Sequence, residues 1–299
     1  MQALRDWFRE FLDYPEYEQH PTARLLVPYC EDTQITKRFY YDLTANDVYF
    51  LLFFIRNSPT CLENMIKLRV DGEITEENPK PLHCSSAKSA TILIPVAIKL
   101  REGAHAAAVI VDNRRREIEY FDPNGSEYSE AWLETQQFLQ ARFAQQYPNH
   151  EFISTEQFCP LGPQAQANTS LCAAWTLLYL QTRLQFPTLS RQLIINSMLS
   201  FSRATLNQII AGYMCYLFKF GRESGIFHAV NLQARLTDIY EKFIALPYEL
   251  QSTHGDEFDA LMRQVQSAVD QGDFGQIPKL AGQHEALLSS IEKLVGPPP

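Results

Sequence analysis

The chain has 299 residues, of which 45% are hydrophobic and 20% are charged, a composition typical of a globular protein that can bury a core. Its 26 basic and 35 acidic residues give a formal net charge of −9, which argues against a nucleic-acid partner. The longest apolar runs, at residues 48–55 and 91–100, are shorter than the roughly 20 residues that a membrane-spanning helix needs. We therefore expect no membrane span.

The six cysteines are spread along the chain at positions 30, 61, 84, 159, 172 and 215. They include no C-x-x-C pair, and no histidines with zinc-site spacing accompany them, so no metal site is expected. The first residues also lack the basic and apolar regions of a secretory signal peptide. Scattered thiols are typical of a reducing compartment. They predict a cytoplasmic location and leave one thiol free to act as a nucleophile.

The first ninety residues contain two stretches with helical features, at 4–11 and 48–55, and turn signals at 71–72 and 78–81. Residues 91–98 are rich in β-branched side chains, and 106–111 form a second apolar run, so both predict strands. Residues 117–121 alternate polar and apolar side chains after the turn residues 112–115. This pattern predicts a β-hairpin from His105 to Asp122.

The rest of the chain predicts mainly helices. Helical spacing covers 131–147, and a short strand follows at 152–154. Residues 160–163 and the glutamine-containing segment 164–166 are expected to be loops. A nearly continuous apolar helix is expected from 171 to 184, stopped by Pro187. Further helical segments lie at 193–220, 230–243, 258–269 and 285–294. We therefore predict an α+β fold with an N-terminal segment (1–88) packed on a core (89–187) and a helical C-terminal region (188–299).

Three residues, His105, Asp122 and Cys172 in chain order, suggest covalent catalysis. Cys172 stands at the predicted start of a helix, where the helix dipole and free N–H groups favour a thiolate. His105 begins one strand and Asp122 ends the next, so the hairpin brings them side by side. The histidine can pair with the thiolate, and the carboxylate can orient the histidine. The amide of Gln164 or Gln166, with the N–H of Cys172, could stabilise an oxyanion.

The order His105, Asp122, Gln166, Cys172 resembles the adenovirus-protease clan, which includes the proteases that deconjugate ubiquitin-like modifiers. The 17-residue step from His105 to Asp122, the phrase Phe-Asp-Pro-Asn-Gly at 121–125 and the placing of Gln166 and Asn168 six and four residues before Cys172 carry this resemblance. Residues 162–164 and 172–175 are similar to sequences from large DNA viruses and bacterial effectors of the same clan. The resemblance covers roughly residues 90–186.

The resemblance implies a papain-like cysteine protease core, in which a small mixed sheet is packed by helices. It implies a protein substrate that carries ubiquitin or a ubiquitin-like modifier, and hydrolysis without a cofactor. It also implies a location in the host cytosol if the chain is an effector or viral protein. Substrate contacts are assigned to Ala106, Asn168 and Trp175, although a core or cleft-wall position is favoured for Trp175, one turn past Cys172. The chain departs from the clan at Ala106, where a tryptophan is usual, and at Ala173, where many members have glycine.

Several alternatives remain open at the level of sequence. Spacing favours Gln166 as the oxyanion donor, whereas the Gly-Pro-Gln context favours Gln164. Asn124 competes with Asp122 as the residue that orients the histidine, although an Asn-Gly pair more simply forms a turn. His83 and Cys84 form a rival thiol site. The same triad could also mature a viral polyprotein at Gly-rich sites or transfer an acyl group, and the chain could be a non-catalytic binding module.

Overall fold

The computed structural model describes residues 2–12, 60–77, 79, 82, 84, 89–101, 103–128, 132–223, 236, 238–271 and 275–296. The predicted helix at 48–55 lies outside these residues. The chain forms two compact units, residues 1–218 and 219–299. The first is α+β and is built on a mixed sheet, and the described helices of the second have no strand among them. None of the described helices is long and apolar enough to cross a membrane.

The sheet of the first unit has the strand order β3-β2-β4-β5-β6-β7, with β1 paired to β4. Antiparallel pairing joins β2 to β3, β4 to β5 and β5 to β6, while the pairs β1–β4, β2–β4 and β6–β7 are parallel. The strands are β1 (Thr60–Leu62), β2 (Ile66–Asp71), β3 (Glu73–Glu76), β4 (Thr91–Lys99), β5 (Ala104–Asp112), β6 (Glu117–Phe121) and β7 (Glu151–Ile153).

The predicted strands at 91–98, 106–111 and 117–121 are confirmed as β4, β5 and β6. In β4, Pro95 cannot donate a backbone hydrogen bond. It lies between the segment that pairs with β1, which ends at Leu93, and the segment that pairs with β2, which begins at Val96. A proline is tolerated in this central strand because the strand that pairs with β4 on this edge changes from β1 to β2 at the same point.

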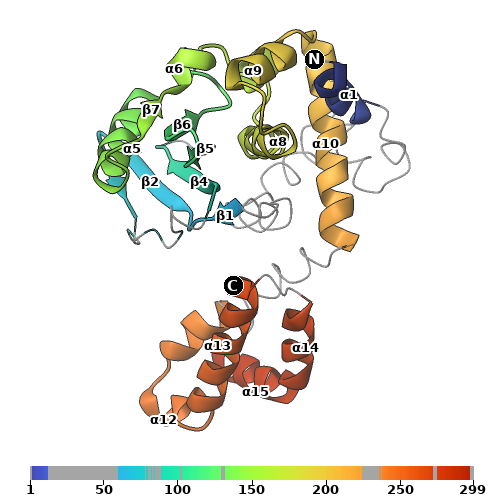
Figure 1. Ribbon diagram of the computed structural model, residues 1–299. Helices are drawn as coiled ribbons and strands as arrows, with labels where there is room; N and C mark the ends of the chain where they lie inside the picture. Colours follow the sequence, from blue (N-terminus) through green and yellow to red (C-terminus); the bar gives the residue numbers. More distant parts are fainter. Residues whose placement is uncertain are drawn as a thin grey trace. The chain divides into compact units, whose positions relative to one another are not determined.

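The helices of the first unit are α1 (Gln2–Glu10), α5 (Trp132–Gln146), α6 (Thr155–Phe158), α7 (Pro163–Ala167), α8 (Cys172–Gln185) and α9 (Arg191–Leu199), and α10 (Arg203–Glu223) runs past the boundary at 218. Figure 1 shows α5 on one face of the sheet and α8 on the other. Alternate residues of β4, such as Ile94 and Val96, share a core with Leu139 and Phe143 of α5. The other face of the sheet is therefore available to α8.

Two predicted boundaries were wrong. The loop expected around 164–166 is the short helix α7, since Pro163 stands at its first turn, where a missing N–H costs nothing. The helix expected over 193–220 is interrupted after Leu199, because the side chain of Ser202 accepts a hydrogen bond from the N–H of Thr205 and caps a new helix.

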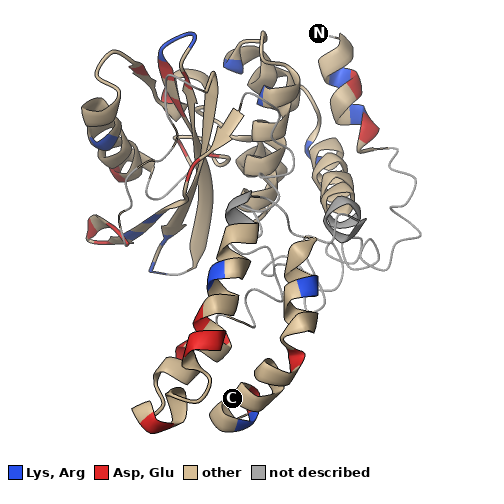
Figure 2. Ribbon diagram, turned by 60° about the horizontal axis from the view of Figure 1, so that its bottom comes forward, with Lys and Arg blue, Asp and Glu red and all other residues tan. Residues whose placement is uncertain are grey.

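The second unit contains α12 (Tyr248–Gln251), α13 (Gly255–Gln271), α14 (Gln276–Gln283) and α15 (Glu285–Val295). Three of its aromatic side chains meet at the buried Phe258, whose ring centroid lies 5.6 Å from that of Phe243 and 5.7 Å from that of Tyr240. Helix α14 packs against both α13 and α15. Figure 2 shows both signs of charge spread over the described helices and strands of the molecule.

The sequence suggested that the cysteines are free thiols, but two of them form a disulfide. Cys61 in β1 forms a disulfide with Cys84, 23 residues away. The pairing follows from tertiary structure, because the N–H of Cys84 donates a 2.8 Å hydrogen bond to the buried carboxylate of Glu63, directly after β1. The spacing of the cysteines therefore no longer indicates a reducing compartment. Cys84 is also removed as a rival nucleophile, and His83 lies outside the described residues.

Candidate active site

The structure brings Cys172, His105 and Asp122 together at one end of β5 and β6. His105 is the second residue of β5 and Asp122 directly follows β6. The antiparallel register pairs Ala108 with Phe121. The side chains of His105 and Asp122 are therefore diagonal neighbours across the hairpin. The imidazole Nε2 lies 2.9 Å from Oδ1 of Asp122. Cys172 begins α8, and the interaction of its thiol with the imidazole contributes to a raised pKa of His105.

The electrostatics of this group favour an ion pair between thiolate and imidazolium. Burial disfavours the charged imidazole, but the charge and hydrogen bond of Asp122 outweigh it and, with Cys172, raise the pKa of His105 to about 10. Burial also disfavours the charged thiolate. Even so, the hydrogen bond and charge of His105, with the N–H groups of Ala106 and Ala173, lower the pKa of the Cys172 thiol.

The other free cysteines of the described residues have a raised thiol pKa, in contrast to Cys172. Burial raises the pKa of the Cys159 thiol, and nearby carboxylates raise it further. Burial raises the pKa of Cys215 to about 12. Cys172 is half-buried, whereas both of these thiols are buried. Of the free thiols that the structure describes, Cys172 is thus the one suited to nucleophilic attack.

Asp122 is fully buried and held from several sides. Its Oδ1 also accepts a 2.9 Å hydrogen bond from the N–H of Asn124, so Asn124 serves the turn and supports the acid. The backbone N–H of Asp122 donates to Oγ1 of Thr155, which donates to the carbonyl of Tyr120. The Tyr120 hydroxyl lies 3.5 Å from Oδ2 of Asp122. Sequence reasoning missed Tyr120, although residues two apart in a strand share a face.

The loop after Asp122 lies directly against the loop before α7. The N–H of Gly162 donates to the carbonyl of Asn124, and the N–H of Gln164 donates to that of Pro123, each at 3.0 Å. A Cβ atom on Gly162 would lie 2.1 Å from the Pro123 carbonyl oxygen, and one on Gly125 would lie 2.4 Å from that of Pro160. Only glycine permits this approach of the two backbones.

The two predicted glutamines have different surroundings. The Gln166 amide donates hydrogen bonds to the carbonyls of Leu199 and Phe201, which occupies both of its N–H groups. The Gln164 amide donates one hydrogen bond to the carbonyl of Thr169, and its Oε1 is buried without a partner among the described residues. Gln164 therefore keeps an N–H that an incoming group could use.

The three residues predicted to contact a substrate also have different surroundings. Trp175 is fully buried, and its Nε1 donates a 3.0 Å hydrogen bond to Oγ1 of Thr169, a placement that suits a core residue bracing the loop before Cys172. Asn168 is exposed and ends α7 in the left-handed conformation, with a φ of 55°. Ala106 lies close to Cys172, because its backbone N–H helps to lower the pKa of that thiol.

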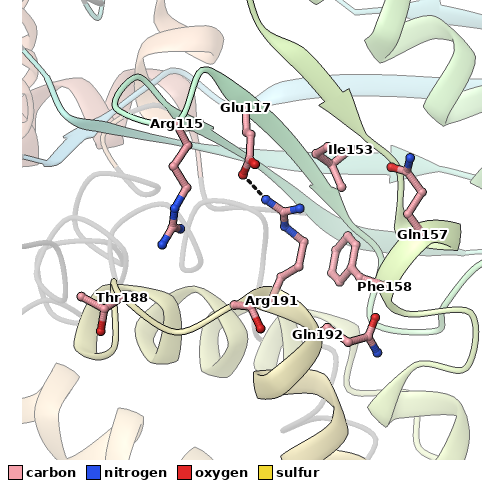
Figure 3. A pocket seen from close by; sticks show the side chains of 9 residues that line it. Arg115, Glu117, Ile153, Gln157, Phe158, Thr188, Arg191 and Gln192 are labelled. Carbon is pink, nitrogen blue, oxygen red and sulfur yellow. Dashed lines mark hydrogen bonds and ion pairs between the residues drawn. The ribbon is translucent and has the colours of Figure 1, made fainter.

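A cavity of about 330 Å³ lies at the opposite end of β6 from Asp122. Figure 3 shows Arg115 and Arg191 over this cavity, with Arg191 joined to Glu117 and with Phe158 and Ile153 beside it. Because the cavity borders Glu117 and not the triad, we do not assign it to the reacting group. Among the described residues, no group of three or more His, Cys, Asp or Glu side chains could hold a metal ion.

Comparison with known proteins adds no assignment. No family model, curated protein or solved structure matches the chain.

Proposed function

We propose that the protein is a cysteine protease or isopeptidase that removes ubiquitin or a ubiquitin-like modifier from other proteins. The observation that carries the reaction class is the arrangement of Cys172 at the start of α8, His105 and Asp122. The substrate class is taken from the resemblance of residues 90–186 to the adenovirus-protease clan. A papain-like core agrees with the α+β architecture and mixed sheet.

In the proposed reaction the Cys172 thiolate attacks the carbonyl carbon of the scissile amide. The C–N bond breaks as His105 gives its proton to the leaving amine, and an acyl thioester remains on Cys172. Water then loses a proton to His105 and attacks the thioester, which releases the acid and restores the thiol pair. Asp122 keeps Nε2 of His105 oriented through both steps.

The developing oxyanion needs donors beside Cys172. We assign this role to the N–H of Cys172, in the first turn of α8, where backbone N–H groups have no intrahelical acceptor. The Gln164 amide is the second assigned donor, since both N–H groups of the Gln166 amide are occupied. The loss of one such donor typically slows catalysis by about 10²- to 10³-fold.

The test is intact-mass spectrometry of the full chain after incubation with ubiquitin and SUMO that carry an electrophile at the C-terminus. We expect one adduct, absent from Cys172→Ala and retained by the matched control Cys215→Ala, which removes a buried free thiol. Selective labelling of Cys172 by iodoacetamide without any protein adduct would move the proposal to a polyprotein or acyl-transfer substrate. An equal reaction of all free thiols would overturn the catalytic proposal in favour of a binding module.

A further inference from the structure

Helix α8 carries a stripe of polar side chains along the face that includes the nucleophile. Cys172, Thr176, Tyr179 and Arg183 follow one another at intervals of four, three and four residues, so they lie on one side of the helix. Helix α8 packs against β5. Thr176 and Tyr179 are fully buried, and Arg183 is only 7% exposed. Buried polar groups in this number require specific partners.

The first partner lies on the strand of the base. Thr176, one turn after Cys172, donates a 3.2 Å hydrogen bond from Oγ1 to the carbonyl of Ala106. The backbone N–H of the same residue, Ala106, helps to lower the pKa of the Cys172 thiol. Ala106 directly follows His105 in β5. The Thr176 hydroxyl thus ties α8, one turn after Cys172, to the backbone segment of β5 that carries His105.

The second set of partners lies on the strand of the acid. The Tyr179 hydroxyl donates to Oε1 of Glu119 in β6, and Nη2 of Arg183 lies 3.2 Å from Oε2 of the same carboxylate. The Tyr179 ring stacks on Phe121, with ring centroids 3.8 Å apart. Phe121 directly precedes Asp122, so this contact reaches the end of the strand that presents the acid.

We propose that Thr176, Tyr179 and Arg183 are positioning residues that fix α8 along the sheet and hold the Cys172 sulfur against His105. This inference rests on the proposed function of the triad. An apolar stripe allows a helix to shift by fractions of an ångström, because dispersion contacts have little directionality. Hydrogen bonds to backbone carbonyl and carboxylate oxygens have preferred directions. They therefore set the register that nucleophile and base need to within about 0.5 Å.

The first test compares Thr176→Val, which removes the hydroxyl at nearly constant volume, with Thr176→Ser, which keeps it. The matched control is Thr182→Val. Thr182 is also fully buried in α8, but its hydroxyl donates to Leu178 of the same helix and accepts from Trp7. The readout is the rate of Cys172 alkylation by iodoacetamide from about pH 5 to about pH 9, a range that brackets the ordinary thiol pKa of about 8.5.

We expect Thr176→Val to shift the midpoint of this profile upward and to slow alkylation at the acid end by about tenfold, as a midpoint shift of about one pKa unit gives. Thr176→Ser restores the wild-type profile, and Thr182→Val leaves the profile unchanged while lowering the unfolding midpoint. A Thr176→Val profile that coincides with wild type, or an equal shift in Thr182→Val, overturns the inference.

A second variant, Tyr179→Phe, keeps the ring on Phe121 and removes only the hydroxyl that reaches Glu119. It keeps the inference testable if Thr176→Val fails to fold. A smaller upward shift is expected, and no shift overturns the role of Tyr179. If wild-type Cys172 itself ionises like a free thiol, the proposed function fails. If wild type shows the lowered midpoint and the folded variants share it, only the positioning inference fails.

Discussion

Replacement of Gly162 by alanine tests whether the contact between two loops fixes the position of Asp122. A Cβ atom at this position would lie 2.1 Å from the Pro123 carbonyl oxygen and 2.5 Å from the N–H nitrogen of Gly125. Both neighbours are backbone atoms, so neither can turn aside as a side chain would. The loops must separate to admit the methyl group, and Pro123 is bonded directly to Asp122.

The size of the effect follows from these distances. An ordinary contact for Cβ begins at 3.4 Å, so the loops must part by about 1 Å, and overpacking of this kind costs about 1 to 3 kcal/mol of unfolding free energy. The hydrogen bonds from Gly162 to Asn124 and from Gln164 to Pro123 lengthen with it. A shift of about 1 Å in a catalytic group can cost about 10²-fold in rate.

The assay measures two quantities on the full chain, the free energy of unfolding in urea and the alkylation rate of Cys172 near neutral pH. We expect Gly162→Ala to lower both. The control is Gly282→Ala in α14, where a Cβ atom meets nothing within 4 Å, and alanine in a helix stabilises by about 0.5 to 1 kcal/mol. A Gly162→Ala protein with wild-type stability and wild-type alkylation would refute the coupling between this loop and Asp122.

Three further predictions concern charge and covalent structure. The proposed hydrolysis should follow a bell-shaped pH profile, because the ion pair forms above the lowered pKa of Cys172 and is lost as His105 deprotonates near pH 10. An alkaline limb close to pH 6.5, the ordinary histidine value, would contradict the pairing with Asp122. Asp122→Asn removes the charge that raises the pKa of His105, so the same limb should move toward neutral pH, and an unmoved limb would assign the shift to another group. Reduction of the disulfide between Cys61 and Cys84, which spans 23 residues, should lower the unfolding free energy of the first unit by about 3 kcal/mol. Urea titrations with and without reductant measure this loss, with the Cys61→Ser/Cys84→Ser variant as control, and equal midpoints for reduced and oxidised protein would count against it.

The central part of the fold could be predicted because local pattern and tertiary structure agree there. The β-branched run at 91–98 and the polar–apolar alternation at 117–121 become strands β4 and β6. Strands β1 and β2 were not predicted, since their pairing with β4 joins residues far apart in sequence. The disulfide was missed for the same reason, as nothing near Cys61 or Cys84 indicates that they meet.

The candidate site was predictable only in part. The helix start at Cys172 and the hairpin between His105 and Asp122 are local patterns, and the structure brings the three side chains together as their order predicted. The roles of the glutamines could not be separated by spacing. They depend on the carbonyl groups of Leu199 and Phe201, which reach the Gln166 amide only once α9 and α10 have formed.

The pairing of β4 with β5 has a consequence for how the chain can vary. Nine consecutive residue pairs join these strands, and His105 lies opposite Ile98 near one end of the ladder. Because side chains alternate between the two faces of a sheet, the insertion or deletion of one residue in β5 would reverse the orientation of each side chain beyond it. Exchanges of one apolar side chain for another leave this orientation intact. The position of His105 is thus encoded in the length of a strand more than in the identity of its residues.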